Sequence, residues 1–188
     1  MTAPPDGLPN DPDANDPDDG SVAGPPGGGP AIDAARFRQV LGHFPTGVTV
    51  VAAIDGAEPV GLAVGSFTSV SLDPPLVAFC AAKRSLSWPK IRDAGVFCVN
   101  VLSQHQEALC RSFATKGADK FAGVGWEASG TGSPRLIGVL AWIDCTIEAV
   151  HDGGDHEICI GRVKELDVGA ETDGPLVFYR GGYGRFEP

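Results

Sequence analysis

The clearest strand signal in the chain lies in residues 136–166, which read LIGVLAWIDCTIEAVHDGGDHEICIGRVKEL. Its first half alternates Ile143, Cys145 and Ile147 with the set Trp142, Asp144, Thr146 and Glu148. Alternation with a period of two is typical of a strand with one face turned to the core. A Gly-Gly turn follows, and residues 156–166 then form a second apolar run. We therefore expect two strands, at 136–150 and 156–166, joined at a glycine turn.

Short β-branched or apolar runs occur on both sides of this pair. They cover residues 48–53, 60–67, 76–81, 96–102 and 176–180, with Gly, Pro and Asp between them. Together these make about seven short strands, a number that favours a closed or nearly closed antiparallel barrel over alternating βαβ units.

Three helices are expected between the strands. The first begins after a capping Asp33 and ends before Pro45, and its apolar residues are Phe37, Val40, Leu41 and Phe44. The second covers Trp88–Ala94, with Ser87 as its N-cap and Gly95 as its stop. The third covers approximately residues 104–114. The fold class is therefore mainly β with a few short helices.

Composition limits the classes of function. The chain has 188 residues, of which 43% are hydrophobic, and a net charge of −10, so nucleic acid and anionic membranes are poor partners. Residues 1–30 hold eight Pro, six Gly and six Asp without an aromatic or basic residue. We expect a disordered tail over residues 1–32 and a single domain over residues 33–188.

Cysteine usage indicates a reducing compartment. The five cysteines are dispersed and form no CxxC pair, which argues against a disulfide framework or a zinc site and fits the cytoplasm. No apolar run is long enough to span a bilayer, so no membrane role is expected.

The common nucleotide-binding motifs are missing from the sequence. It has no GxGxxG between a strand and a helix, no GxxxxGK[ST], no HExxH and no GxSxG. Two polar segments remain as candidates. Residues 66–71 (SFTSVS) either bind a phosphate or ribityl chain or only satisfy a strand end, and residues 80–87 (CAAKRSLS) either bind an anion or form a solvated loop.

The histidine-rich turn and the C-terminus leave similar alternatives open. The possible ligands of residues 151–156 (HDGGDH) sit in a Gly-Gly turn, and no thiolate or further acid lies at characteristic spacing, so no metal is expected there. His156 opens a strand and either hydrogen-bonds a polar ligand or is a structural histidine. Residues 179–185 (YRGGYGR) either fold over a planar ligand or form a frayed end.

Taken together and in this order, several segments resemble the flavin reductase family, the small reductase components of two-component monooxygenases. The segments are Phe37–Leu41, Pro45–Val50, Ser66–Pro75, Phe97–Leu102, Asp119–Gly123, Gly154–His156 and Tyr179–Tyr183. The resemblance implies an antiparallel Greek-key split β-barrel that is homodimeric and holds flavin in a groove near the dimer interface.

The resemblance also implies roles for individual residues. Thr46, Gly47 and Val48 would contact the flavin, and Ser66, Phe67, Thr68 and Ser69 would hold its ribityl and phosphate region. Cys80, Ala81, Ala82 and Lys83 would line the isoalloxazine, Ser87 would lie near phosphate, and Phe113, Lys120 and Phe121 would close the pocket. His156 and Tyr183 would flank the nicotinamide, with His156 orienting it.

The implied activity is an NAD(P)H-dependent reduction of FMN or FAD, with NADH favoured over NADPH and the reduced flavin supplied to a separate oxygenase. Hydride transfer between the two cofactors requires position and a water-poor cleft from the protein rather than an acid or base. Two rivals share the same barrel: an enzyme that keeps FMN bound and reduces another acceptor, and a non-catalytic flavin-binding or haem-binding module.

Overall fold

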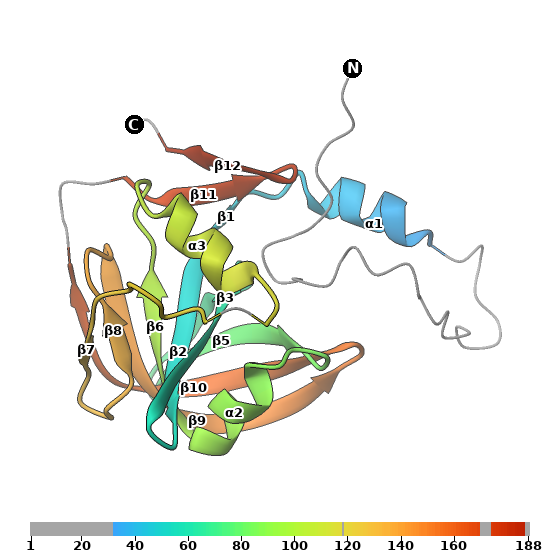
Figure 1. The fold of residues 1–188 in the computed structure, drawn as a ribbon. Helices are drawn as coiled ribbons and strands as arrows, with labels where there is room; N and C mark the ends of the chain where they lie inside the picture. Colours follow the sequence, from blue (N-terminus) through green and yellow to red (C-terminus); the bar gives the residue numbers. More distant parts are fainter. Residues whose placement is uncertain (1–31, 118, 170–173, 187–188) are drawn as a thin grey trace.

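The computed structural model describes residues 32–117, 119–169 and 174–186, so most of the tail expected at residues 1–32 lies outside the described residues. The described part contains three helices and twelve strands (Figure 1). The helices are α1 (Ala34–Leu41), α2 (Trp88–Ala94) and α3 (Glu107–Ala114). The strands are β1 (Thr46–Gly47), β2 (Thr49–Asp55), β3 (Glu58–Val64), β4 (Thr68–Leu72), β5 (Pro75–Ala82), β6 (Val96–Val101), β7 (Trp126–Ala128), β8 (Pro134–Leu136), β9 (Ala141–Gly153), β10 (His156–Val168), β11 (Leu176–Tyr179) and β12 (Gly182–Arg185).

The main sheet has seven antiparallel strands in the order β3-β2-β6-β9-β10-β5-β4. The sheet curls so far that β3, at one end of this order, contacts β5, the second strand from the other end. The expectation of a mainly β, antiparallel barrel with few helices is therefore confirmed. Two smaller sheets, β1-β11-β12 and β7-β8, lie outside the main one.

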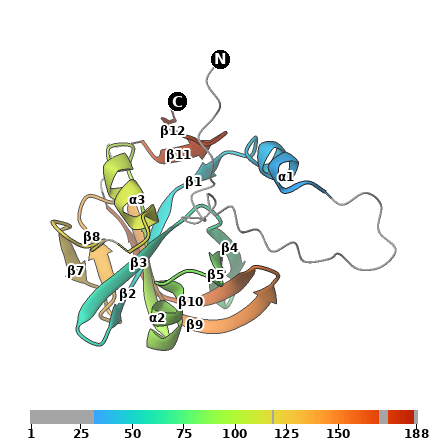
Figure 2. The same ribbon diagram turned by 45° about the vertical axis from the view of Figure 1, so that its right-hand side comes forward.

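Two apolar clusters fill the space on either side of the main sheet. The first, the α3-side cluster, includes Phe113 of α3 and Phe178 of β11. The second, the α2-side cluster, includes Trp88 and Ile91 of α2. In both views, α3, β11 and β12 lie at one end of the body while α2 and the tip of the β9–β10 hairpin lie at the other (Figures 1 and 2).

The β9–β10 hairpin is the pair of long strands expected from the alternating sequence. Gly154 and Asp155 form the turn, and Gly154 has a φ of 84°, which favours glycine. The expected division of β9 into a core face and a polar face is wrong near its start, because Trp142 and Asp144 are both buried. Asp144 tolerates burial because Ser129 Oγ, Thr131 N and Thr131 Oγ1 all donate hydrogen bonds to its carboxylate, at 2.7–2.8 Å.

Helix α1 begins where the sequence predicts. The Asp33 carboxylate accepts hydrogen bonds from the backbone N–H groups of Ala35 and Arg36, at 3.2 and 3.4 Å. None of the helix's residues is buried, and α1 extends sideways from the body (Figures 1 and 2). No described helix is long and apolar enough to cross a membrane.

Helix α2 has the expected bounds but a different cap. Gly95 ends it in a left-handed conformation with φ of 71°, as predicted. Ser87 occupies the N-cap position, yet its hydroxyl makes no capping bond, and Ser85 Oγ accepts from Trp88 N instead, at 3.2 Å. The predicted capping role of Ser87 is therefore wrong.

Candidate functional site

The end of β5 and the beginning of β10 lie side by side and form the centre of the candidate site. His156 pairs with Ala82, Glu157 with Ala81 and Ile158 with Cys80 in the antiparallel register. Residues paired across two strands point to the same face, so His156, Ala82, Cys80 and Ile158 share one face of the sheet. The structure thus brings together Cys80–Ala82 and His156, which the sequence placed 74 or more positions apart.

Ser66 attaches the next segment to this face. Its hydroxyl accepts a hydrogen bond from Cys80 N at 2.8 Å and donates to Cys80 O at 3.3 Å. Ser66 therefore fixes the chain between β3 and β4 against the edge of β5. Phe67 is half-buried against the α2-side cluster, while Thr68 and Ser69 are exposed on β4.

The loop from β5 to α2 borders a cleft of about 260 Å³. Its walls come from β3, from the start of α2 and from the segment after α3: Glu58, Pro59, Val60, Gly61, Ser85, Leu86, Ser87, Lys90, Lys116, Gly117, Asp119 and Lys120. Lys120 Nζ donates to Ser87 Oγ at 3.2 Å and to Gly61 O at 3.3 Å. Two predicted site residues, Ser87 and Lys120, are therefore joined at this cleft.

The remaining predicted residues lie toward the other end of the body. Thr46 and Gly47 form β1, which pairs with β11. Val48 and Phe113 are buried in the α3-side cluster, and the rings of Phe113 and Phe121 meet edge to face at 4.9 Å. This group contributes to the core between α3 and β11 rather than to the walls of the cleft.

Tyr183 belongs to the same end. Its hydroxyl lies 3.2 Å from Cys110 Sγ, and the guanidinium of Arg111 lies 4.8 Å from its ring centroid. Burial, together with the hydrogen bond to Cys110, raises the pKa of Tyr183, so the phenol stays neutral. The described contacts of one chain do not join Tyr183 to His156, although the resemblance implies that both flank the nicotinamide.

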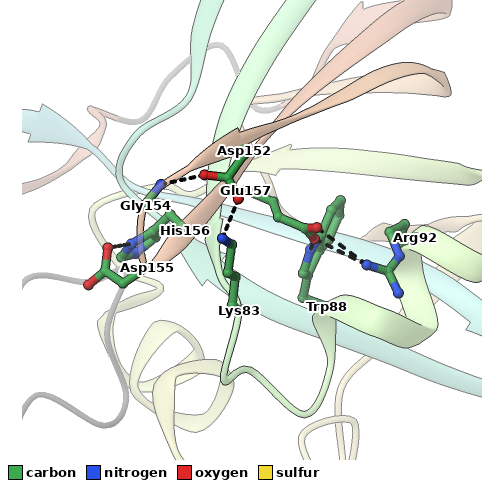
Figure 3. Close-up of polar contacts among 8 residues, drawn as sticks. All are labelled: Lys83, Trp88, Arg92, Asp152, Gly154, Asp155, His156 and Glu157. Atoms are coloured by element: carbon green, nitrogen blue, oxygen red, sulfur yellow. Dashed lines mark hydrogen bonds and ion pairs between the residues drawn. The ribbon is translucent and has the colours of Figure 1, made fainter. Parts of the chain in front are cut away.

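His156 is held by its neighbour in the turn. Its Nδ1 lies 2.7 Å from Asp155 Oδ1, a contact drawn in Figure 3. This hydrogen bond lowers the pKa of the Asp155 carboxyl. An Nδ1–H donated to Asp155 leaves Nε2 as the ring nitrogen able to meet a polar ligand.

A family model described as "Flavin reductase like domain" matches residues 41–187 of the chain. The chain belongs to this family. It is 57% identical over 157 residues to a flavin reductase of Pseudomonas putida, which covers 83% of this chain and 92% of that protein. It is 52% identical over 170 residues to the reductase subunit HsaB of a flavin-dependent monooxygenase of Rhodococcus jostii, covering 90% and 84%.

A solved structure of a flavin reductase family relative agrees in fold. The NADH:FAD oxidoreductase SgcE6 of Streptomyces globisporus, in complex with NAD and FAD fragments, matches with a TM-score of 0.78 and 38% identity. The match covers 83% of this chain and 94% of that one. The resemblance to the flavin reductase family, and with it the split-barrel fold, is confirmed.

The chemistry of these residues fits the flavin that the family name implies. A flavin nucleotide presents a planar ring, a hydroxylated chain and at least one phosphate. The hydroxyls and ammonium groups along the cleft, Ser85, Ser87, Lys116 and Lys120 among them, suit a phosphate. No three His, Cys, Asp or Glu side chains gather as a metal site within the described ranges.

Sequence reasoning missed several charged residues of the site. Lys90 and Lys116 line the cleft. Asp152 binds Lys83 in the loop that leads to the cleft, and Glu157 binds Arg92 in α2. Their partners lie far away in sequence: Asp152 and Lys83 are 69 residues apart, as are Glu157 and Trp88. The only available signal was the pair of acidic residues on either side of the glycine turn.

Proposed function

We propose that this chain reduces FMN or FAD with NADH and supplies the reduced flavin to a separate monooxygenase. The observation that carries the proposal is the pairing of His156 with Ala82, which puts the expected nicotinamide residue beside the expected flavin-lining strand. NADH is favoured over NADPH because the relative from Streptomyces globisporus carries NADH in its name. The relative from Rhodococcus jostii, a reductase subunit, supports an oxygenase partner.

When bound, flavin would supply the hydride acceptor for the nicotinamide, and the protein's part is to hold both rings and exclude water. Cys80 and Ala82 line the ring on the face that carries His156, and Lys83 lies at its edge. Ser66, Phe67, Thr68 and Ser69 hold the ribityl region, and Ser87 and Lys120 hold phosphate. Phe113 and Phe121 pack edge to face and support the segment that carries Lys120.

His156 orients the nicotinamide through Nε2, with Asp155 fixing the ring. Tyr183 belongs to the nicotinamide side through its neutral hydroxyl. In a homodimer, Tyr183 of one protomer would have a second route to the nicotinamide beside His156 of its partner.

The active form is a homodimer. Helix α1 and the turn after it expose four apolar side chains, each between 43% and 71% accessible: Phe37, Val40, Leu41 and Phe44. A short amphipathic helix with no buried residue gains little from its own chain, and a second copy is the partner that the family resemblance implies. The dimer belongs in a reducing cytoplasm, in keeping with five cysteines that are all free.

The first experiment is NADH oxidation by the purified protein, followed at 340 nm with FMN or FAD added in turn. Turnover that saturates with added flavin is expected of a reductase that uses diffusible flavin, and the two saturation curves rank FMN against FAD. Flavin that copurifies tightly without any NADH turnover would instead identify a binding module, and a Soret band would identify a haem protein.

A further inference from the structure

Two carboxylates face each other at the tip of the β9–β10 hairpin. Asp152 and Glu157 are Cα partners in the strand register, so their side chains lie on one face of the hairpin, opposite in parity to His156. Like charges placed directly across two strands weaken the pairing unless cations compensate them. The two carboxylates therefore need cationic partners from outside the hairpin.

Both partners come from one segment, the β5–α2 loop and α2 (residues 83–92). Lys83 Nζ lies 2.5 Å from Asp152 Oδ2, and Arg92 lies 3.2 Å from Glu157 Oε2. Trp88 Nε1 also donates to Glu157, at 2.5 Å. Figure 3 shows Lys83, Trp88 and Arg92 reaching the two carboxylates from the same side.

A backbone bond completes the connection. Lys83 N donates to Asp155 O at 3.0 Å, and Asp155 in turn holds the His156 ring. The segment 83–92 thus meets the hairpin tip at its beginning, at Trp88 and at its end. Trp88 is 1% exposed, so this attachment reaches the α2-side core.

We propose that Asp152 and Glu157 are positioning residues, an acidic clamp that holds segment 83–92 against the hairpin tip carrying His156. The inference rests on the proposed function and deepens it, since segment 83–92 includes Lys83 and Ser87 on the flavin side and His156 is on the nicotinamide side. Holding both sides in one unit fixes the relative position of the two rings, on which hydride transfer depends steeply.

The clamp acts on position more than on overall stability. The Lys83 and Asp152 side chains are 41% and 77% exposed, and such surface pairs add little to the free energy of unfolding. A Glu157→Gln substitution keeps an acceptor for the Trp88 indole while removing the charge opposite Arg92. Its effect is therefore expected to be local.

The hairpin supplies its own matched control. Glu148 accepts two hydrogen bonds from Arg162, both at 2.7 Å, farther along the same two strands. Glu148→Gln thus removes the same kind of charge from the same hairpin. If Asp152 and Glu157 formed only ordinary surface ion pairs, removing the charge of Asp152, of Glu157 or of Glu148 would have the same effect.

The experiment compares wild-type protein with Asp152→Asn, Glu157→Gln, the double variant, Asp152→Glu and Glu148→Gln. Hydrogen exchange measured by mass spectrometry reports on peptides covering 83–92 and 153–157. We expect exchange there to rise about threefold or more in the double variant and to stay at the wild-type rate in Glu148→Gln. Flavin affinity, measured by fluorescence titration, should fall in the double variant alone.

Steady-state kinetics then separate positioning from simple support. We expect kcat/KM for NADH to fall about tenfold in the double variant, with an unchanged melting temperature. Asp152→Glu, which keeps both carboxylates, should behave like the wild-type protein. Faster exchange without any change in kinetics or flavin affinity would overturn the positioning role, as would identical behaviour of the double variant and Glu148→Gln. If wild-type protein binds flavin but never oxidises NADH, the proposed function fails, and exchange and flavin affinity alone decide whether the clamp exists.

Discussion

Cys80 is set apart from the other four cysteines by its exposure. Cys98, Cys110, Cys145 and Cys159 are buried, whereas Cys80 is partly accessible on the candidate flavin face. Burial raises the pKa of Cys98 and of Cys159 to about 12 and raises the pKa values of Cys110 and Cys145 as well. These four thiols stay protonated at pH 8 and react slowly.

We expect a thiol reagent at pH 8 to modify one of the five cysteines rapidly in folded protein, and saturating FMN or FAD to slow that reaction. Absorbance of the chromophore released from the reagent gives the number of cysteines modified and the rate of modification. Loss of the fast phase in Cys80→Ala would identify Cys80 as the fast-reacting cysteine. A fast reaction that flavin leaves unchanged would contradict the placement of Cys80 against the ring.

His156 provides the second residue-scale prediction. His156→Ala removes one oriented hydrogen-bonding group, which is worth about 1.4 kcal/mol or a tenfold change in affinity. We expect the KM for NADH to rise about tenfold while the KM for flavin changes less than twofold. Steady-state assays that vary each substrate in turn measure both constants, and equal increases in the two would argue against the nicotinamide role.

At this scale the sequence predicted local structure better than long-range contacts. His156 could be singled out because it opens a strand beside a glycine turn. The use of the Ser87 hydroxyl was mispredicted because capping depends on which of two nearby serines, Ser85 or Ser87, points at the free N–H groups. Lys120 donates a hydrogen bond to the Ser87 hydroxyl from 33 residues away in the sequence, and no local pattern reveals that contact.

At the scale of elements, strong periodicity and caps predicted most of the fold. The Asp33 cap and the Gly95 stop appear where their patterns indicate, and β10 begins at His156 as expected. Its partner β9 was expected at 136–150 but covers Ala141–Gly153. Strands β4, β7 and β12 were missed because they are only three to five residues long and mostly exposed, too short for an alternating pattern to stand out. Their pairing depends on partner strands that the sequence does not place beside them.

Gly161 in β10 leads to a prediction about packing. A Cβ at this position would lie 2.5 Å from Phe97 Cζ and 3.3 Å from Cys145 Cβ, both on neighbouring buried side chains. We expect Gly161→Ala to lower the free energy of unfolding by about 1–3 kcal/mol, because the core has no room for the methyl group. Urea denaturation measures the change.

Gly184 in β12 is the control for that substitution. No atom lies within 4 Å of a Cβ built there, and its φ is not in the left-handed region. Gly184→Ala should alter the free energy of unfolding by less than about 0.5 kcal/mol. If Gly161→Ala proved equally mild, Phe97 would have to move freely, which its complete burial argues against.

For the whole molecule, α1 is the element that the single chain does not explain. Its apolar side chains remain exposed although the turn after it is tied to the body by the bond from Arg180 N to Gly42 O, at 2.9 Å. The sequence could predict the helix from its cap and spacing. The sequence could not predict that the apolar side chains of α1 are exposed, because the same helical pattern arises whether the apolar face packs on its own chain or on another chain.

The proposed dimer can be tested through that face. Phe37→Asp combined with Phe44→Asp should shift the protein from dimer to monomer in sedimentation velocity, since each substitution would bury a charge at the interface without touching the core of the single chain. The monomer should keep its far-ultraviolet circular dichroism. Ile137→Asp, which alters a side chain 56% exposed outside α1, should leave the dimer intact. A wild-type protein that sediments as a monomer at all concentrations would rule out the dimer, and Tyr183 could then reach the nicotinamide only by a rearrangement within its own chain.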